Sequence, residues 1–90
     1  MNREEITLKS SSSVGVGKLA GSIANFIREG KRVKVSAIGA GAVNQAVKSI
    51  ATAQGMTATS GIEIYTKMGF DNTKINGENL VVMVFTIYQK

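Results

Sequence analysis

The stretch AIGAGAVNQAV at 37–47 places two glycines before an adjacent amide pair, a pattern that could hold an anion. A glycine-rich turn that leads into a helix exposes backbone N–H groups, which bind phosphate together with the positive end of the helix dipole. Gly39 and Gly41 occupy the turn, while Asn44 and Gln45 could bond a sugar, a phosphate or a base edge. Alternatively, the glycines only allow a tight turn, and the amide pair is solvated helix surface or a subunit contact.

Other chemistries find little support in the residue types. The chain has no cysteine and no histidine, which excludes thiolate and imidazole chemistry. The segment GVGKLA at 15–20 fits G-x-G-x-x-A, but four serines separate it from the preceding strand and no carboxylate ends the next one. A dinucleotide site is therefore not expected. The six carboxylates are scattered. We expect no catalytic residues, no metal, no cofactor and no small-molecule substrate.

The chain carries a net charge of +5, from 11 lysines and arginines against six aspartates and glutamates. This balance favours an anionic partner, nucleic acid first, although ordinary solubility charge explains it equally well. The N-terminal sequence MNREEITLKS lacks the apolar region of a signal peptide, and the longest apolar run, LVVMVF, is too short to span a bilayer. We therefore expect a cytoplasmic protein without membrane contact.

Hydrophobic spacing predicts a single domain with the element order β-α-β-α-β-β. Alternating apolar residues indicate strands, and apolar residues three and four apart indicate amphipathic helices. Gly55 should end the second helix, and the segment DNTKING at 71–77 is rich in turn residues. The core stripe predicted for the second helix is Val43, Ala46, Val47, Ile50 and Ala53. The predicted elements are strands at 4–10, 32–38, 62–68 and 79–88 and helices at about 14–29 and 41–54.

These elements predict a two-layer α/β (α+β) sandwich. Right-handed crossover connections place both helices on one face of the sheet. The strand at 79–88 is apolar on both faces and should lie centrally, whereas the strands at 4–10 and 62–68 alternate and suit the edges. The expected sheet is mixed, with the last strand antiparallel to its neighbours. Numbered along the chain, the strands are expected in the order 1-2-4-3.

This topology brings the loops at 10–13 and 39–42 and the hairpin at 69–78 to one end of the molecule, where both helices begin. Helix starts, serine hydroxyls and lysines together suit contacts with a phosphate backbone. The serines could instead serve only as a helix cap and a loop. The nucleic-acid-binding residues predicted at this end are Lys9, Ser11, Ser12, Ser13, Gly39, Gly41, Asn44, Lys67 and Lys74.

A rival basic surface lies at the opposite end of the predicted fold. Arg28, Lys31, Arg32 and Lys34 form the densest basic cluster in the chain. They flank the C-terminus of the first helix, whose negative dipole end gives those charges a local structural explanation. A second class of function also stays open, in which the polar loop end is a non-catalytic module that docks another protein.

The strand at 79–88 also predicts self-association. Its apolar side chains point to both faces of the sheet, and the helices can cover only one set. The core of a ninety-residue domain is small, and an uncovered apolar stripe is unfavourable in water. We therefore expect a homodimer or a higher oligomer. The uncovered stripe should be flanked by Thr7, Ser36 and Tyr65. The two sets are Leu80, Val82 and Val84 on one face and Val81, Met83, Phe85 and Ile87 on the other.

The motif AIGAGAVNQAVKSIATAQG at 37–55 closely resembles the core motif of the bacterial stage V sporulation protein S family. Shorter matches spread over most of the chain: KSS at 9–11, LAG at 19–21, SGI at 60–62, Phe70, and INGE at 75–78. That family is similar in fold to the dimeric nucleic-acid-binding Alba proteins, which share the β-α-β-α-β-β order. The resemblance implies a regulator of sporulation or cell development that acts through nucleic acid.

Overall fold

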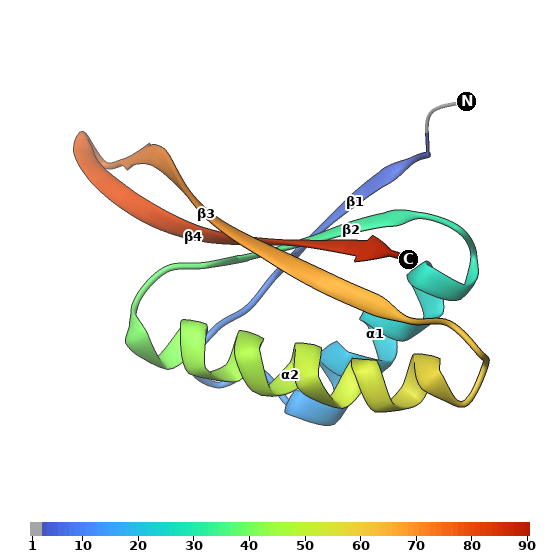
Figure 1. Ribbon diagram of the computed structural model, residues 1–90. Coiled ribbons are helices and arrows are strands. Elements are labelled where there is room, and N and C mark those ends of the chain that lie inside the picture. The colour runs from blue at the N-terminus through green and yellow to red at the C-terminus, as the bar shows by residue number, and fades with distance from the viewer. Residues whose placement is uncertain (1–2) are drawn as a thin grey trace.

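The chain has the element order β-α-β-α-β-β in a computed structural model that describes residues 3–90 (Figure 1). The predicted order is therefore confirmed. Within residues 3–90, neither helix is long and apolar enough to cross a membrane. The elements are β1 (Glu5–Lys9), α1 (Val16–Arg28), β2 (Arg32–Ala37), α2 (Ala40–Ala58), β3 (Ile64–Ile75) and β4 (Glu78–Gln89).

The four strands form one mixed sheet in the order β1-β2-β4-β3. β1 and β2 run parallel, and β4 is antiparallel to both β2 and β3. Both helices lie against one face of this sheet, and no helix or strand of residues 3–90 forms a layer over the other face (Figure 1). The predicted strand order, the inner position of β4 and the two-layer α+β architecture are confirmed.

The core lies between the helices and the sheet. Its largest buried apolar side chains are Phe85, Ile23, Ile27, Ile87, Val33 and Val35. α2 contributes a face of small residues, where the fully buried Ser49 donates its hydroxyl to the carbonyl of Gln45 at 2.7 Å. The prediction that Val47 is a core residue is wrong, because its side chain is 50% exposed. Ser49 takes part in the buried face instead, since its bond to the helix backbone satisfies the hydroxyl.

Two element boundaries differ from the prediction. α2 continues through Gly55 to Ala58, because burial of Ala53 and Thr57 against the rest of the fold outweighs the roughly 1 kcal/mol that a helical glycine costs. β3 continues through most of the segment that was expected to be a turn. The hairpin turn is only Asn76 and Gly77, whose φ angles of 53° and 80° suit a two-residue turn between antiparallel strands.

β3 and β4 are 12 residues each and extend well past the helical layer (Figure 1). We call the projecting part, residues 70–83, the hairpin arm. Its register is fixed by the pair of Ile75 with Glu78 beside the turn. The hairpin bends away from α2 (Figure 1), so Phe70 is 77% exposed although it lies on the same side of β3 as the buried Ile64.

The apolar stripe expected on the open face of the sheet is largely covered within one chain. Val82 is 9% exposed, and Leu80 and Val84 are half-buried. Val82 faces a hollow that the serine loop and the hairpin arm also line. Most of the exposed apolar side chains lie instead along α2 and β3, where Met68 is 66% exposed and lines a hollow together with Val47. Val81 of β4 is exposed as well, at 58%.

Candidate nucleic-acid interface

A cleft of about 670 Å³ lies at the end of the molecule where α2 begins. Three segments form it: the serine loop after β1, the turn from β2 into α2, and the hairpin arm. We call it the loop cleft. Among the described residues that line it, Lys9 is the one that carries a charge. Its polar and glycine lining includes Lys9, Ser10, Ser11, Ser12, Gly39 and Gly41, with Thr73 and Ile75 on the arm.

The two glycines of the turn act in different ways. Gly39 has φ 90° and ψ 157°, a backbone conformation that only glycine adopts readily. Gly41 is helical, but a Cβ atom there would lie 2.8 Å from the Cβ of Ser12. The first glycine therefore shapes the turn, and the second lets the serine loop approach the start of α2.

Hydrogen bonds fasten the serine loop to α2. Ser10 donates its hydroxyl to the carbonyl of Ala42 at 2.8 Å. The Gln45 side chain donates its amide to the carbonyl of Val14 at 3.0 Å, and Asn44 donates to the Gln45 side-chain oxygen at 3.2 Å. Gln45 of the amide pair therefore has a structural role: it joins the start of α2 to the residues just before α1.

Both helices start without a side-chain cap. The N-cap positions are Gly15 and Gly39, and neither helix has an acidic residue in its first turn. The serines do not cap α1; the hydroxyl oxygens of Ser11 and Ser13 instead lie 3.4 Å apart. First-turn N–H groups that lack an internal partner carry the positive end of the helix dipole. At α2 this end opens on the loop cleft.

The structure brings together some of the predicted site residues and separates others. Five of them line the loop cleft: Lys9, Ser11, Ser12, Gly39 and Gly41. Four lie outside its lining: Ser13, Asn44, Lys67 and Lys74. Asn44 is exposed on α2, and Lys67 lies further along β3 beside a second hollow. Lys74 alternates with Thr73 and Ile75, so it projects from the opposite face of the arm.

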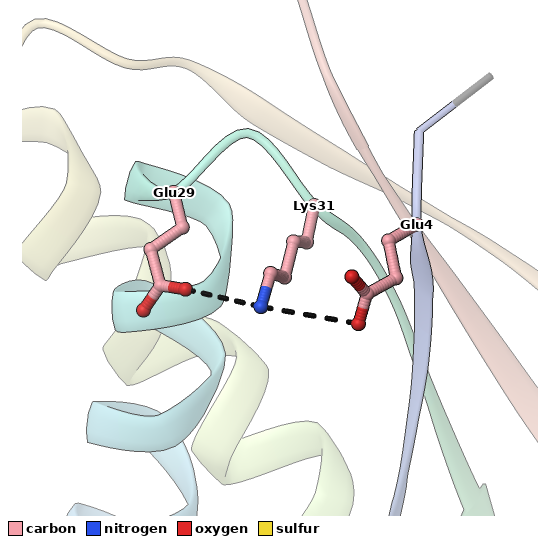
Figure 2. A network of polar contacts seen from close by, with 3 residues as sticks. All are labelled: Glu4, Glu29 and Lys31. Atoms are coloured by element: carbon pink, nitrogen blue, oxygen red, sulfur yellow. Dashed lines mark ion pairs between the residues drawn. The ribbon is translucent and has the colours of Figure 1, made fainter.

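The rival basic cluster is dispersed. Arg28 donates to Ser60 Oγ at 3.0 Å and to the Met56 carbonyl at 2.9 Å, which fastens α1 to the end of α2. Lys31 lies between Glu29 at 3.2 Å and Glu4 at 3.9 Å (Figure 2). The other two members, Arg32 and Lys34, lie on the open face of the sheet.

Sequence reasoning missed the pair of Tyr65 and Tyr88 on the open face. These residues lie opposite each other on β3 and β4, and their rings stack. The sequence does contain a signal for this pair. Residues at equal distances along the chain from a two-residue turn at Asn76 and Gly77 lie opposite each other on the two strands, and Tyr65 and Tyr88 are such residues. Placing the turn correctly would have predicted the pair.

The fold and the cleft define a class of small α+β proteins: a mixed sheet with helices on one face and an uncapped helix start beside a polar loop. Comparison with protein families gives a match to the model described as Stage V sporulation protein S over residues 6–90. The chain therefore belongs to the stage V sporulation protein S family, and the resemblance found in the sequence is confirmed. It is a small sporulation-related protein.

Proposed function

We propose that this protein is a non-enzymatic regulator that binds nucleic acid at the loop cleft in the cytoplasm. The observation that carries the proposal is the start of α2, which has no side-chain cap and no acidic neighbour in its first turn and opens on a cleft that contains Lys9. A phosphate group suits such a site, because unpaired N–H groups and a positive dipole end both favour an anion. The net charge of +5 supports a polyanionic ligand.

Within the cleft, each group has a defined part in this proposal. The Lys9 ammonium neutralises a phosphate, and the hydroxyls of Ser11 and Ser12 donate to its oxygens. The bare first turn at Gly41 adds backbone N–H donors. Ser13, Asn44, Lys67 and Lys74 lie outside the cleft lining and would contact further phosphates of a longer ligand. None of these contacts reads a base, so the loop cleft supplies affinity rather than sequence preference.

Replacing Lys9 with alanine should weaken binding and reduce its dependence on salt. Each lost phosphate contact lowers the slope of log affinity against log salt by about one unit, because fewer counterions are released on binding. The measurement is fluorescence anisotropy with labelled single- and double-stranded DNA and RNA at several salt concentrations. Lys48→Ala removes the same charge from the middle of α2, outside the cleft, and should leave the slope unchanged. Equal slopes for Lys9→Ala and the wild type would place the phosphates elsewhere.

We also propose that the protein self-associates through α2 and β3. Val47 and Met68 line a shallow hollow of about 320 Å³ whose described lining carries no charged side chain. Phe70 extends this apolar strip along the same side of β3. A second copy of the chain presents the same strip, so a two-fold dimer would cover both at once. The small core of the monomer adds a reason for association.

Phe70→Lys should shift the protein towards the monomer, because the new charge would have to be desolvated in the interface. Size-exclusion chromatography with light scattering at high micromolar concentration measures the mass. Ile75→Lys is the matched control: Ile75 is an exposed apolar residue of the same arm, but it lines the loop cleft instead of the strip. A wild-type protein that is monomeric at this concentration would contradict the proposal.

A further inference from the structure

Three side chains stack in one row across the open face of the sheet. Tyr65 of β3 pairs with Tyr88 of β4, and their ring centroids lie 5.2 Å apart with an interplanar angle of 19°. Arg32 of β2 lies over the Tyr88 ring, 5.4 Å from its centroid. Because β4 lies between β2 and β3, Arg32 and Tyr65 flank Tyr88 from opposite sides. Tyr65 is 52% exposed on the edge strand, and it also lines the hollow that contains Val47 and Met68.

Basic side chains occupy the neighbouring row of the same face. Lys34 of β2 and Lys67 of β3 both pair with Thr86 of β4, so they stand on either side of it. Both lysines line a shallow hollow of about 290 Å³. Part of this hollow is formed by Gly69 and Val84, a cross-strand pair in which one partner has no side chain. The row therefore forms a low groove with a lysine on each side.

This groove continues into the loop cleft. Ser36 pairs with Lys9 on one side and with Val84 on the other. Lys9 and Ser36 line the loop cleft, and Val84 lines the groove. A chain-like ligand that enters at the start of α2 can therefore follow the open face as far as Tyr65 without crossing an edge of the sheet.

The charge of this path is positive. Its basic side chains are Lys9, Arg32, Lys34 and Lys67, and its carboxylates are Glu5 and Asp71. Glu5 makes an ion pair of 3.5 Å with Lys34, but both side chains are more than a third exposed, and such pairs contribute little. Lys34 therefore stays available to a phosphate.

We propose that this open face binds single-stranded nucleic acid, with an unpaired base stacked on Tyr65 and the phosphates beside Lys34 and Lys67. Proteins hold single strands by combining a basic groove with exposed aromatic rings, and a four-stranded sheet can present such rings on its open face. A duplex keeps its bases inside the helix, where Tyr65 cannot reach them. The inference rests on the proposed nucleic-acid-binding function and adds the class of ligand to it.

The intrinsic fluorescence of the protein reports on this face directly. The chain has two tyrosines and no tryptophan, so all of its tyrosine emission comes from Tyr65 and Tyr88. Adding an oligothymidylate of about 12 nucleotides, within the usual range of single-strand site sizes, should quench that emission. A blunt duplex of the same length should leave the emission unchanged, after correction for absorbance, because it offers no free base to stack.

Substitutions at Tyr65 separate the ring from its hydroxyl. Tyr65→Leu should weaken binding of the oligothymidylate roughly 5- to 150-fold, the range that base–aromatic stacking contributes, and leave duplex binding unchanged. Tyr65→Phe keeps the ring and should bind like the wild type. Anisotropy of a fluorescein-labelled oligonucleotide gives the affinities, and circular dichroism checks that the fold is intact, as expected for a half-exposed side chain.

The outcomes distinguish this inference from the function on which it rests. If the oligothymidylate binds but tyrosine emission does not change and Tyr65→Leu binds equally well, the open face is not the site, and the loop cleft keeps its proposed function. If neither the single strand nor the duplex binds at low salt, the proposed function itself fails. A Tyr65→Phe variant that loses as much affinity as Tyr65→Leu would also overturn stacking as the mode of contact.

Discussion

Replacing Gly39 with alanine should lower the free energy of unfolding by about 1–3 kcal/mol, the cost of holding a side chain in a backbone region reserved for glycine. The φ of 90° and ψ of 157° place this residue there, and a Cβ atom would meet no described atom within 4 Å beyond the two neighbouring residues. The cost is therefore conformational and not steric. Relief of the strain would shift the turn that leads into α2, so binding at the loop cleft should weaken as well. Urea denaturation followed by circular dichroism gives the stability change.

Gly55 supplies the matched control in the same helix. It is helical, and a Cβ there would also meet no atom within 4 Å. Gly55→Ala should therefore stabilise the protein by up to about 1 kcal/mol, the difference in helix propensity. Replacing glycine with alanine should therefore lower the free energy of unfolding at Gly39 and raise it at Gly55. If Gly39→Ala is as stable as the wild type, the turn does not depend on the glycine.

Replacing Gly41 with alanine should destabilise the protein by up to about 2 kcal/mol for a different reason. The new Cβ would lie 2.8 Å from the Cβ of Ser12, closer than side chains pack. Overpacking costs about 1–3 kcal/mol, and the better helix propensity of alanine offsets about 1 kcal/mol of that. The serine loop would have to move away from α2, which strains the hydrogen bond from Ser10 to Ala42. Affinity for nucleic acid should fall with stability.

A second substitution should rescue this variant. Ser12→Gly removes the crowding atom, and the next nearest, the Cα of residue 12, is at an ordinary contact distance of 3.5 Å. Measured against Ser12→Gly alone, adding Gly41→Ala should then cost nothing. This double-mutant cycle isolates the contact between the two residues. If the double variant is as unstable as the sum of the single variants, the close approach of loop and helix is not what requires glycine.

The strand order could be predicted because the last strand is apolar on both faces. Such a strand must lie inside a sheet, and the structure places Phe85 and Ile87 on the helix side and Val82 on the other. The spacing of Ile23 and Ile27 likewise fixes the inner face of α1. These patterns reflect the burial of apolar side chains, which is the largest favourable term in folding. They can therefore be recognised even where single residues depart from them.

Boundaries could not be predicted in the same way, because they depend on contacts that local sequence does not show. Gly55 has the usual character of a helix end, but the helix continues since Ala53 and Thr57 are buried against the core. The segment at 71–74 is polar and lies in a strand because β4 runs opposite it. In both cases tertiary contacts outweighed a weak local preference for a turn.

The same boundary decided how much of the candidate site could be predicted. The meeting of Lys9, the serines and the glycine turn follows from element order alone, and these residues line one cleft. The positions of Lys67 and Lys74 depend on where β3 ends and which side of it each residue faces. With a loop at 69–78, both lysines would gather at the end of the molecule; with a strand through Ile75, they separate.

The two walls of the loop cleft, α2 and the hairpin arm, differ in how much of the fold supports them. The wall formed by α2 is anchored in the core, whereas residues 71–82 of the arm pair only with each other, and Val82 is the one buried side chain among them (Figure 1). Segments with few buried contacts open and reclose without global unfolding. We therefore expect the arm to move relative to α2, while α2 keeps its position against the core. If the start of α2 binds an anion as proposed, movement of the arm would let the cleft accept ligands of different widths while that binding point stays in place.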